Sequence, residues 1–178
     1  MFLRVILVVI LLPSLALSAG LDPWKFGMSS DEVVAFKEQG PYKTFSNGDL
    51  ETDNGQFDGA AANVQFFFEQ NKLNRIGVYL YEGTDRKAAA AAWSHAYKSL
   101  GAAYGSVETP GIEVSSKSGP VAPEVLGIAA GATVDVVGKA QMAPTRQPRD
   151  LFVFASFMRH EVQGKRYYYV IVYFDPRT

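Results

Sequence analysis

The chain has 178 residues, of which 48% are hydrophobic, 13% aromatic and 20% charged. This length and apolar content suffice for a domain with its own core, and they exclude a wholly disordered chain. The chain has no cysteine, which excludes disulfides and thiolate metal sites, and its formal charge of −1 provides no field that would attract nucleic acid.

Residues 1–19 have the pattern of a signal peptide. Arg4 precedes an unbroken apolar run at 5–12, and small residues follow as far as Ala19. We expect cleavage after Ser18 or Ala19 and a soluble mature protein that is periplasmic or secreted. Because no cysteine follows the apolar run, we also expect no lipid anchor and no stable membrane anchor.

A short helix is predicted next. Ser29 and Glu32 form an S-x-x-E capping box, in which each residue satisfies a free backbone N–H of the first turn. Val33 and Val34 are expected to face the core, and Gly40 is expected to end the helix after about ten residues.

Strand and turn signals follow this helix. Residues 42–46 predict a first strand, and turns are expected at Asn47-Gly48 and at Asp53-Asn54-Gly55. Both turn signals end in glycine, which readily adopts the positive φ that tight turns require. The region therefore predicts short strands separated by turns.

Two alternating segments then predict a hairpin. Val64 and Phe66 point to one face of the first segment, and Ile76 and Val78 do the same in the second. Pairing Phe66 with Ile76 and Val64 with Val78 requires a connection of odd length. We therefore expect a loop of three or five residues.

Residues 84–104 predict a longer helix that ends at Gly105. Trp93, Leu100 and Tyr104 belong to a single apolar stripe at helical spacing. His95 lies off this stripe, which predicts a solvent-exposed side chain. The stretch 106–131, rich in serine, glycine and proline, predicts a long surface connection with a short strand at 112–114 or a helical turn, followed by a strand at 134–142.

The end of the chain carries the strongest hairpin signal. Residues 151–162 and 165–174 flank a two-residue turn at Gln163-Gly164, which pairs Glu161 with Arg166 and Phe157 with Val170. On the opposite face, the same register places His160 beside Tyr167, Met158 beside Tyr169 and Phe154 beside Tyr173.

In chain order the mature protein is expected to be helix, three strands, helix and three strands. This order predicts an α+β fold in which two α-β-β-β units form one antiparallel sheet with the helices packed on one face. We expect a single domain over 20–178, made of subunits at about 24–105 and 106–178.

The start of the mature chain resembles that of a superfamily of bacterial envelope proteins. It reads Trp24-Lys25-Phe26-Gly27-Met28-Ser29-Ser30-Asp31-Glu32-Val33, and it is similar to the Gly-Met-Ser/Thr-x-x-Glu-Val opening of BamE-type (SmpA/OmlA-type) proteins and β-lactamase inhibitory protein. A similar hairpin follows at 63–81, so the resemblance covers roughly residues 24–105. It implies a non-enzymatic role in binding proteins or supporting envelope assembly. The BamE-type proteins are lipoproteins and β-lactamase inhibitory protein has disulfides, and this chain has no cysteine for either.

Few groups suited to catalysis are present. His95 and His160 are the two histidines, and glycine-rich phosphate loops, serine-nucleophile motifs and a complete calcium loop are absent. We therefore expect no enzyme, no catalytic residue, no cofactor and no metal. Two alternatives to a protein-binding role stay open: a small-molecule or lipid carrier, and a hydrolase that uses His160.

An aromatic sheet face is the candidate binding surface. Its members lie on strand positions opposite the expected core, and they are Phe67, Tyr79, Tyr81, His160, Tyr167, Tyr169 and Tyr173. Aromatic side chains bury much area at low conformational cost, so such a face suits the recognition of another envelope or secreted protein. The alternative is that the 106–131 connection covers this face as a second layer.

Overall fold

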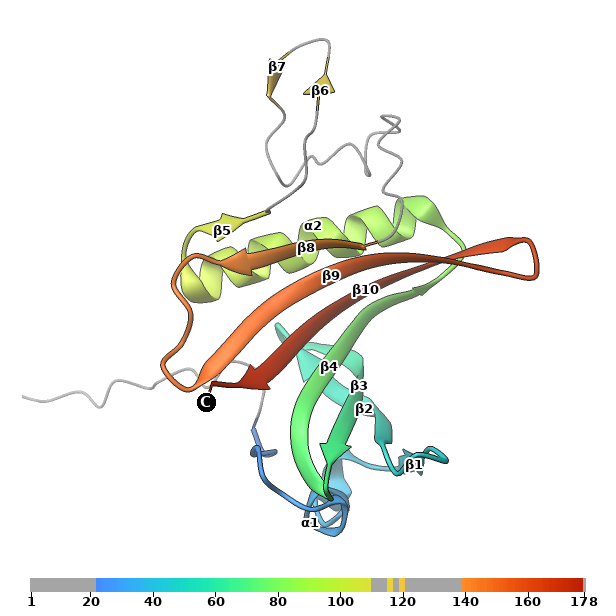
Figure 1. The fold of residues 1–178 in the computed structure, drawn as a ribbon, viewed down its shortest axis with the longest axis vertical. Coiled ribbons are helices and arrows are strands. Elements are labelled where there is room, and N and C mark those ends of the chain that lie inside the picture. Colours follow the sequence, from blue (N-terminus) through green and yellow to red (C-terminus); the bar gives the residue numbers. More distant parts are fainter. Residues whose placement is uncertain (1–21, 110–114, 117–118, 121–138, 178) are drawn as a thin grey trace, which may run out of the picture.

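A large antiparallel sheet dominates the computed structural model, which describes residues 22–109, 115–116, 119–120 and 139–177. Eight strands are ordered β1-β2-β3-β4-β10-β9-β8-β5, and β6 (Ser115–Ser116) and β7 (Gly119–Pro120) form a separate pair. One long helix, α2 (Arg86–Tyr104), lies along one face of the sheet at the β8–β10 side (Figure 1).

The expected α+β architecture is wrong. The described residues are predominantly β, and α2 is their single long helix. The first predicted helix shrinks to α1 (Ser30–Val34), a five-residue turn that covers little of the sheet. The layer of helices is therefore reduced to α2, and strands supply most of the regular backbone.

The capping box of α1 is confirmed, although its length is not. Ser29 Oγ accepts a hydrogen bond from the Glu32 backbone, and the Glu32 carboxylate accepts one from the Ser29 backbone at 2.7 Å. Val33 is fully buried whereas Val34 is exposed, because successive helical residues point about 100° apart and only Val33 faces the core. A 3₁₀ turn, η1 (Lys37–Gln39), leads to β1 (Tyr42–Thr44).

The turn expected at Asp53-Asn54-Gly55 is instead an irregularity inside a strand. Strand β2 (Leu50–Phe57) runs through it, and its register with β3 shifts between Thr52 and Gly55. A Cβ on Gly55 would lie 2.1 Å from Val64 Cγ2, so glycine is needed here for close approach to β3. The chain reverses later, at Asp58-Gly59, where both residues have positive φ.

The register of the next hairpin is confirmed, and its predicted loop length is wrong. Strands β3 (Ala60–Glu69) and β4 (Lys72–Gly83) pair Phe66 with Ile76 and Val64 with Val78. The loop nevertheless has two residues, Gln70-Asn71, because a register shift between Phe67 and Phe68 supplies the extra residue within the strands.

Helix α2 agrees with its sequence signals. Asp85 caps its first turn, Gly105 ends it, and Trp93, Ala96 and Leu100 are buried against the sheet. His95 is exposed, as expected, with its Nε2 4.0 Å from Asp58 Oδ2.

The second half of the sheet follows α2. Strand β5 (Val107–Glu108) pairs with β8 (Lys139–Pro144), and β8 pairs with β9. Most of the predicted 106–131 connection, its expected strand at 112–114, the start of the strand expected at 134–142, and the signal peptide lie outside the described residues.

The final hairpin is confirmed pair by pair. Strands β9 (Leu151–Val162) and β10 (Lys165–Pro176) join through the two-residue turn and pair Glu161 with Arg166 and Phe157 with Val170. Strand β10 also pairs with β4, which unites the two halves of the sheet. The hairpin tip extends beyond the rest of the sheet (Figure 1).

Candidate functional site

The two faces of the central strands differ sharply. On β10, Val170, Val172 and Phe174 belong to the single core cluster that also includes Trp93 of α2 and Trp24 of the N-terminal segment. Because side chains alternate along a strand, Tyr169, Ile171 and Tyr173 point to the opposite face. We call this the aromatic face, and its members are Phe67, Tyr79, Phe152, Phe154, Met158, His160, Tyr167, Tyr169, Ile171 and Tyr173.

The centre of the aromatic face is packed over a glycine. A Cβ on Gly77 of β4 would lie 3.2 Å from Phe67 and from Tyr173, and 3.4 Å from Ile171. Side chains of β3 and β10 therefore close over the bare backbone of β4. The missing side chain lets the rings approach the sheet and each other.

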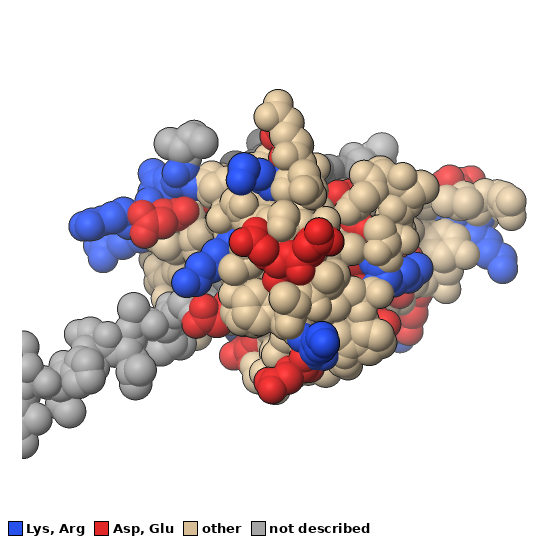
Figure 2. Space-filling model, turned by 90° about the horizontal axis from the view of Figure 1, so that it is seen from below, with Lys and Arg blue, Asp and Glu red and all other residues tan. Residues whose placement is uncertain are grey.

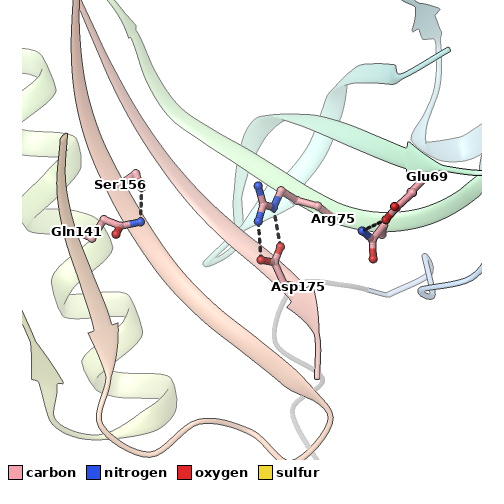
Figure 3. A network of polar contacts seen from close by, with 6 residues as sticks. Glu69, Arg75, Gln141, Ser156 and Asp175 are labelled. Carbon is pink, nitrogen blue, oxygen red and sulfur yellow. Dashed lines mark hydrogen bonds and ion pairs between the residues drawn. The ribbon is translucent and has the colours of Figure 1, made fainter. Parts of the chain in front are cut away.

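A cation and a carboxylate hold one end of the aromatic face together. Arg75 of β4 forms a two-pronged ion pair with Asp175 of β10, with N–O distances of 2.6 and 2.7 Å (Figure 3). The Arg75 guanidinium also lies 5.1 Å from the centroid of the Tyr173 ring, which stacks on Phe154 at the same centroid distance of 5.1 Å. The Tyr173 ring is thus held by the stacked Phe154 ring and by the nearby Arg75 guanidinium.

Tyr79 is half-buried on this face. Burial, reinforced by the nearby Tyr173, Glu82 and Glu51, raises the pKa of its hydroxyl well above the ordinary value for tyrosine. Burial also raises the pKa of Tyr173, although Arg75 opposes that shift. These hydroxyls therefore stay neutral at physiological pH and act as hydrogen-bonding groups.

Polar side chains border this region. Asn63, the register partner of Tyr79, donates hydrogen bonds to the carboxylates of Glu51 and Asp53 on β2. On the same face, towards β8, Ser156 is fully buried and accepts a hydrogen bond from Gln141 at 3.4 Å (Figure 3). Hydrogen-bonded polar side chains therefore border the aromatic residues towards β2 and towards β8.

The structure brings six of the seven candidate residues to one face. Phe67, Tyr79, Tyr169 and Tyr173 lie in the central strands. The other two, His160 and Tyr167, pair near the hairpin tip, and His160 contacts the Tyr169 ring at a centroid distance of 5.6 Å.

Tyr81 lies on the other face. A register shift in β4 at Leu80 aligns Tyr81 with Val170, a core residue, and Tyr81 packs against the core. Its hydroxyl accepts a hydrogen bond from the Asp85 backbone at 2.8 Å, next to the start of α2. Its place beneath the helix gives it a structural role.

Sequence reasoning missed the Arg75–Asp175 pair. Its partners lie 100 residues apart, and no local pattern indicates that β4 and β10 are neighbours. Phe154 and Met158 could have been included, because the predicted register already places them beside Tyr173 and Tyr169.

Other site classes find little support in the part of the chain that the structure describes. Within it, no group of three or more His, Asp or Glu side chains could hold a metal ion. None of its helices is long and apolar enough to span a membrane. Acidic and basic side chains are interspersed with wide uncharged areas in the view from the α1 end (Figure 2).

Neither a protein-family model nor a curated protein nor a solved structure matches this chain.

Proposed function

We propose that this chain is an exported, non-enzymatic module that binds another envelope or secreted protein through the aromatic face. The observation behind the proposal is the convergence of aromatic residues from β3, β4, β9 and β10 on the face opposite α2. Those of β3, β4 and β10 are half-buried, and Phe152 of β9 is exposed. Aromatic and arginine side chains are enriched at the centres of protein interfaces, where they bury much area with few rotatable bonds.

The geometry supports a preorganised surface. Tyr173 is stacked on Phe154, and Arg75 is held by Asp175, so these groups have few alternative conformations to lose when a partner binds. Phe152, which contacts Phe154 with a ring-centroid distance of 5.5 Å, is 42% exposed. The resemblance of residues 24–105 to a superfamily of envelope proteins and the signal-like 1–19 segment favour an exported partner.

The proposal can be tested by photocrosslinking in the cells that produce the protein. Phe152→p-benzoylphenylalanine places a photoreactive ring on the face with little change in shape. We expect one dominant crosslinked protein, whose yield falls severalfold with Tyr79→Ala and Tyr169→Ala combined, while the double variant stays folded at growth temperature. Tyr97→Ala is the matched control. It removes a half-buried tyrosine of α2, away from the aromatic face, and should keep the crosslink.

Two results would contradict this function. One is a crosslink yield that the two face substitutions leave unchanged. The other is unfolding of the double variant at growth temperature, which would show that Tyr79 and Tyr169 belong to a second core.

A further inference from the structure

The charged side chains on the part of the aromatic face around Tyr79 are not balanced. Lys43 of β1 pairs with Glu51 at 3.3 Å, and Arg75 pairs with Asp175. Among the described residues, these ion pairs leave the carboxylates of Asp53 and Glu82 without a cation. Both side chains are exposed.

Asp53 lies on β2, which β3 separates from the strand of Tyr79, and Glu82 lies further along that same strand, β4. Asp53 accepts a hydrogen bond at 2.8 Å from Asn63, which is the register partner of Tyr79 on β3. Glu82 is the register partner of Tyr169 on β10, and Ile171, two residues further along β10, pairs with Tyr79. The register shift at Leu80 is what returns Glu82 to the aromatic face, whereas it directs Tyr81 to the core.

A surface with this composition suits a positively charged group. The π-face of a tyrosine attracts a cation that lies within about 6 Å of the ring centre, and neighbouring carboxylates add direct attraction. Burial is the main cause that raises the pKa of the Tyr79 and Tyr169 hydroxyls, and the nearby Glu82 carboxylate adds to the rise.

We infer that the partner presents a basic segment to this end of the face, with lysine or arginine side chains between Asp53 and Glu82 and over the rings of Tyr79 and Tyr169. This inference rests on the proposed function and names the chemistry of its partner. An extended segment with basic residues at every second position fits best, because only alternate side chains of an extended chain point to one side.

The first experiment measures binding of a defined probe to the purified protein. The probe is a fluorescein-labelled peptide of alternating lysine and threonine, and its comparison is the same peptide with glutamate in place of lysine. We expect fluorescence anisotropy to show binding of the lysine peptide alone. Binding should weaken severalfold between about 0.05 and 0.5 M NaCl, because salt screens exposed charges.

The second step removes the two carboxylates without changing side-chain shape. Asp53→Asn combined with Glu82→Gln should weaken lysine-peptide binding about tenfold. The matched control, Glu38→Gln with Glu108→Gln, removes two exposed carboxylates outside the aromatic face and should change binding less than about twofold. Equal binding of both peptides, no binding of either, or equal loss in both double variants overturns the inference.

The photocrosslinking assay separates failure of this inference from failure of the proposed function. If the tyrosine substitutions abolish the crosslink and Asp53→Asn with Glu82→Gln leaves it intact, the face binds a partner that is not basic. The inference then fails, and the proposed function stands. If neither double variant changes the crosslink, the proposed function fails together with the inference.

Discussion

The two faces of the same strands are built on different principles. On the side of α2, Val170, Val172 and Phe174 are at most 1% exposed and contact other apolar groups. On the other side, Tyr169 and Tyr173 are half-buried and lie near Glu82, Arg75 and Asp175. The first arrangement contributes stability through burial, and the second retains side chains that a partner could still desolvate.

Ile171 and Ser156 qualify this contrast. Both lie on the aromatic face, and both are at most 1% exposed. The aromatic face therefore has its own buried floor beneath a half-buried rim. The comparison predicts a graded response to substitution: large effects under α2, intermediate effects at the floor and small effects at the rim.

The largest effect is expected for Trp93→Ala. Trp93 is 1% exposed and contacts Phe157 edge to face, so its removal leaves a cavity between α2 and the sheet. We expect a loss of about 3–5 kcal/mol in the free energy of unfolding, measured by urea denaturation. Tyr169→Ala, at the rim, should cost less than half as much. Equal losses would mean that the aromatic face is a second core.

Two glycine-to-alanine substitutions compare how well each face accommodates one added methyl group. Gly55→Ala would place its Cβ 2.1 Å from Val64 in the core, and overpacking of this kind costs about 1–3 kcal/mol. Gly77→Ala meets the ends of the Phe67 and Tyr173 rings at 3.2 Å, and these rings can shift. We therefore expect the smaller loss at Gly77, again by urea denaturation.

Gly101→Ala is the control for both glycine substitutions. Its Cβ would meet nothing within 4 Å, and alanine favours a helix over glycine by about 1 kcal/mol. This variant should therefore be more stable than the parent protein. A greater loss at Gly77 than at Gly55 would mean that the aromatic face accommodates an added methyl group less well than the core does.

Local pairing rules predicted much of the architecture. Opposed apolar residues set the register of Phe66 with Ile76, and the two-residue turn set that of Glu161 with Arg166. Both signals are short-range, since each depends on residues that a single turn brings together. For the same reason, six of the seven candidate site residues could be assigned to one face before the structure was known.

The remaining features depend on interactions that a local pattern does not contain. The register shift at Leu80, which turns Tyr81 to the core, arises where β4 pairs with β10, about 90 residues away. The helix after Ser29 stops early although its cap is well formed, because capping determines where a helix begins and not how long it is. The α+β assignment failed mainly on this helix.

Alkaline pH is expected to lower the free energy of unfolding by a smaller amount, through buried tyrosines on both faces. Burial of the Tyr104 hydroxyl on α2, which has no hydrogen-bond partner among the described residues, raises its pKa to about 12. An unfolded tyrosine ionises near pH 10, so the unfolded chain loses its proton first as the pH rises. The stability present below pH 10 is therefore lost progressively towards pH 12. Tyr104→Phe should flatten this loss in urea denaturation, and an unchanged slope would contradict it.

Tyr79→Phe is the matching experiment on the aromatic face. Burial raises the pKa of Tyr79 in the same direction, so its removal should also flatten the alkaline loss of stability. A response at Tyr104 alone would show that Tyr79 is more hydrated in solution than its position in the sheet indicates.

The smallest effect is expected for the Arg75–Asp175 pair, and it is the most direct measure of how dry the aromatic face is. The two side chains are 44% and 21% exposed, and an ion pair open to water contributes about 0.2–1 kcal/mol. A double-mutant cycle with Arg75→Met and Asp175→Asn should give a coupling energy in this range, reduced by 0.5 M NaCl because salt screens exposed charges. A coupling several times larger and insensitive to salt would mean that another part of the chain covers the pair. The aromatic face would then be an interior layer, and its tyrosines would stabilise the fold instead of awaiting a partner.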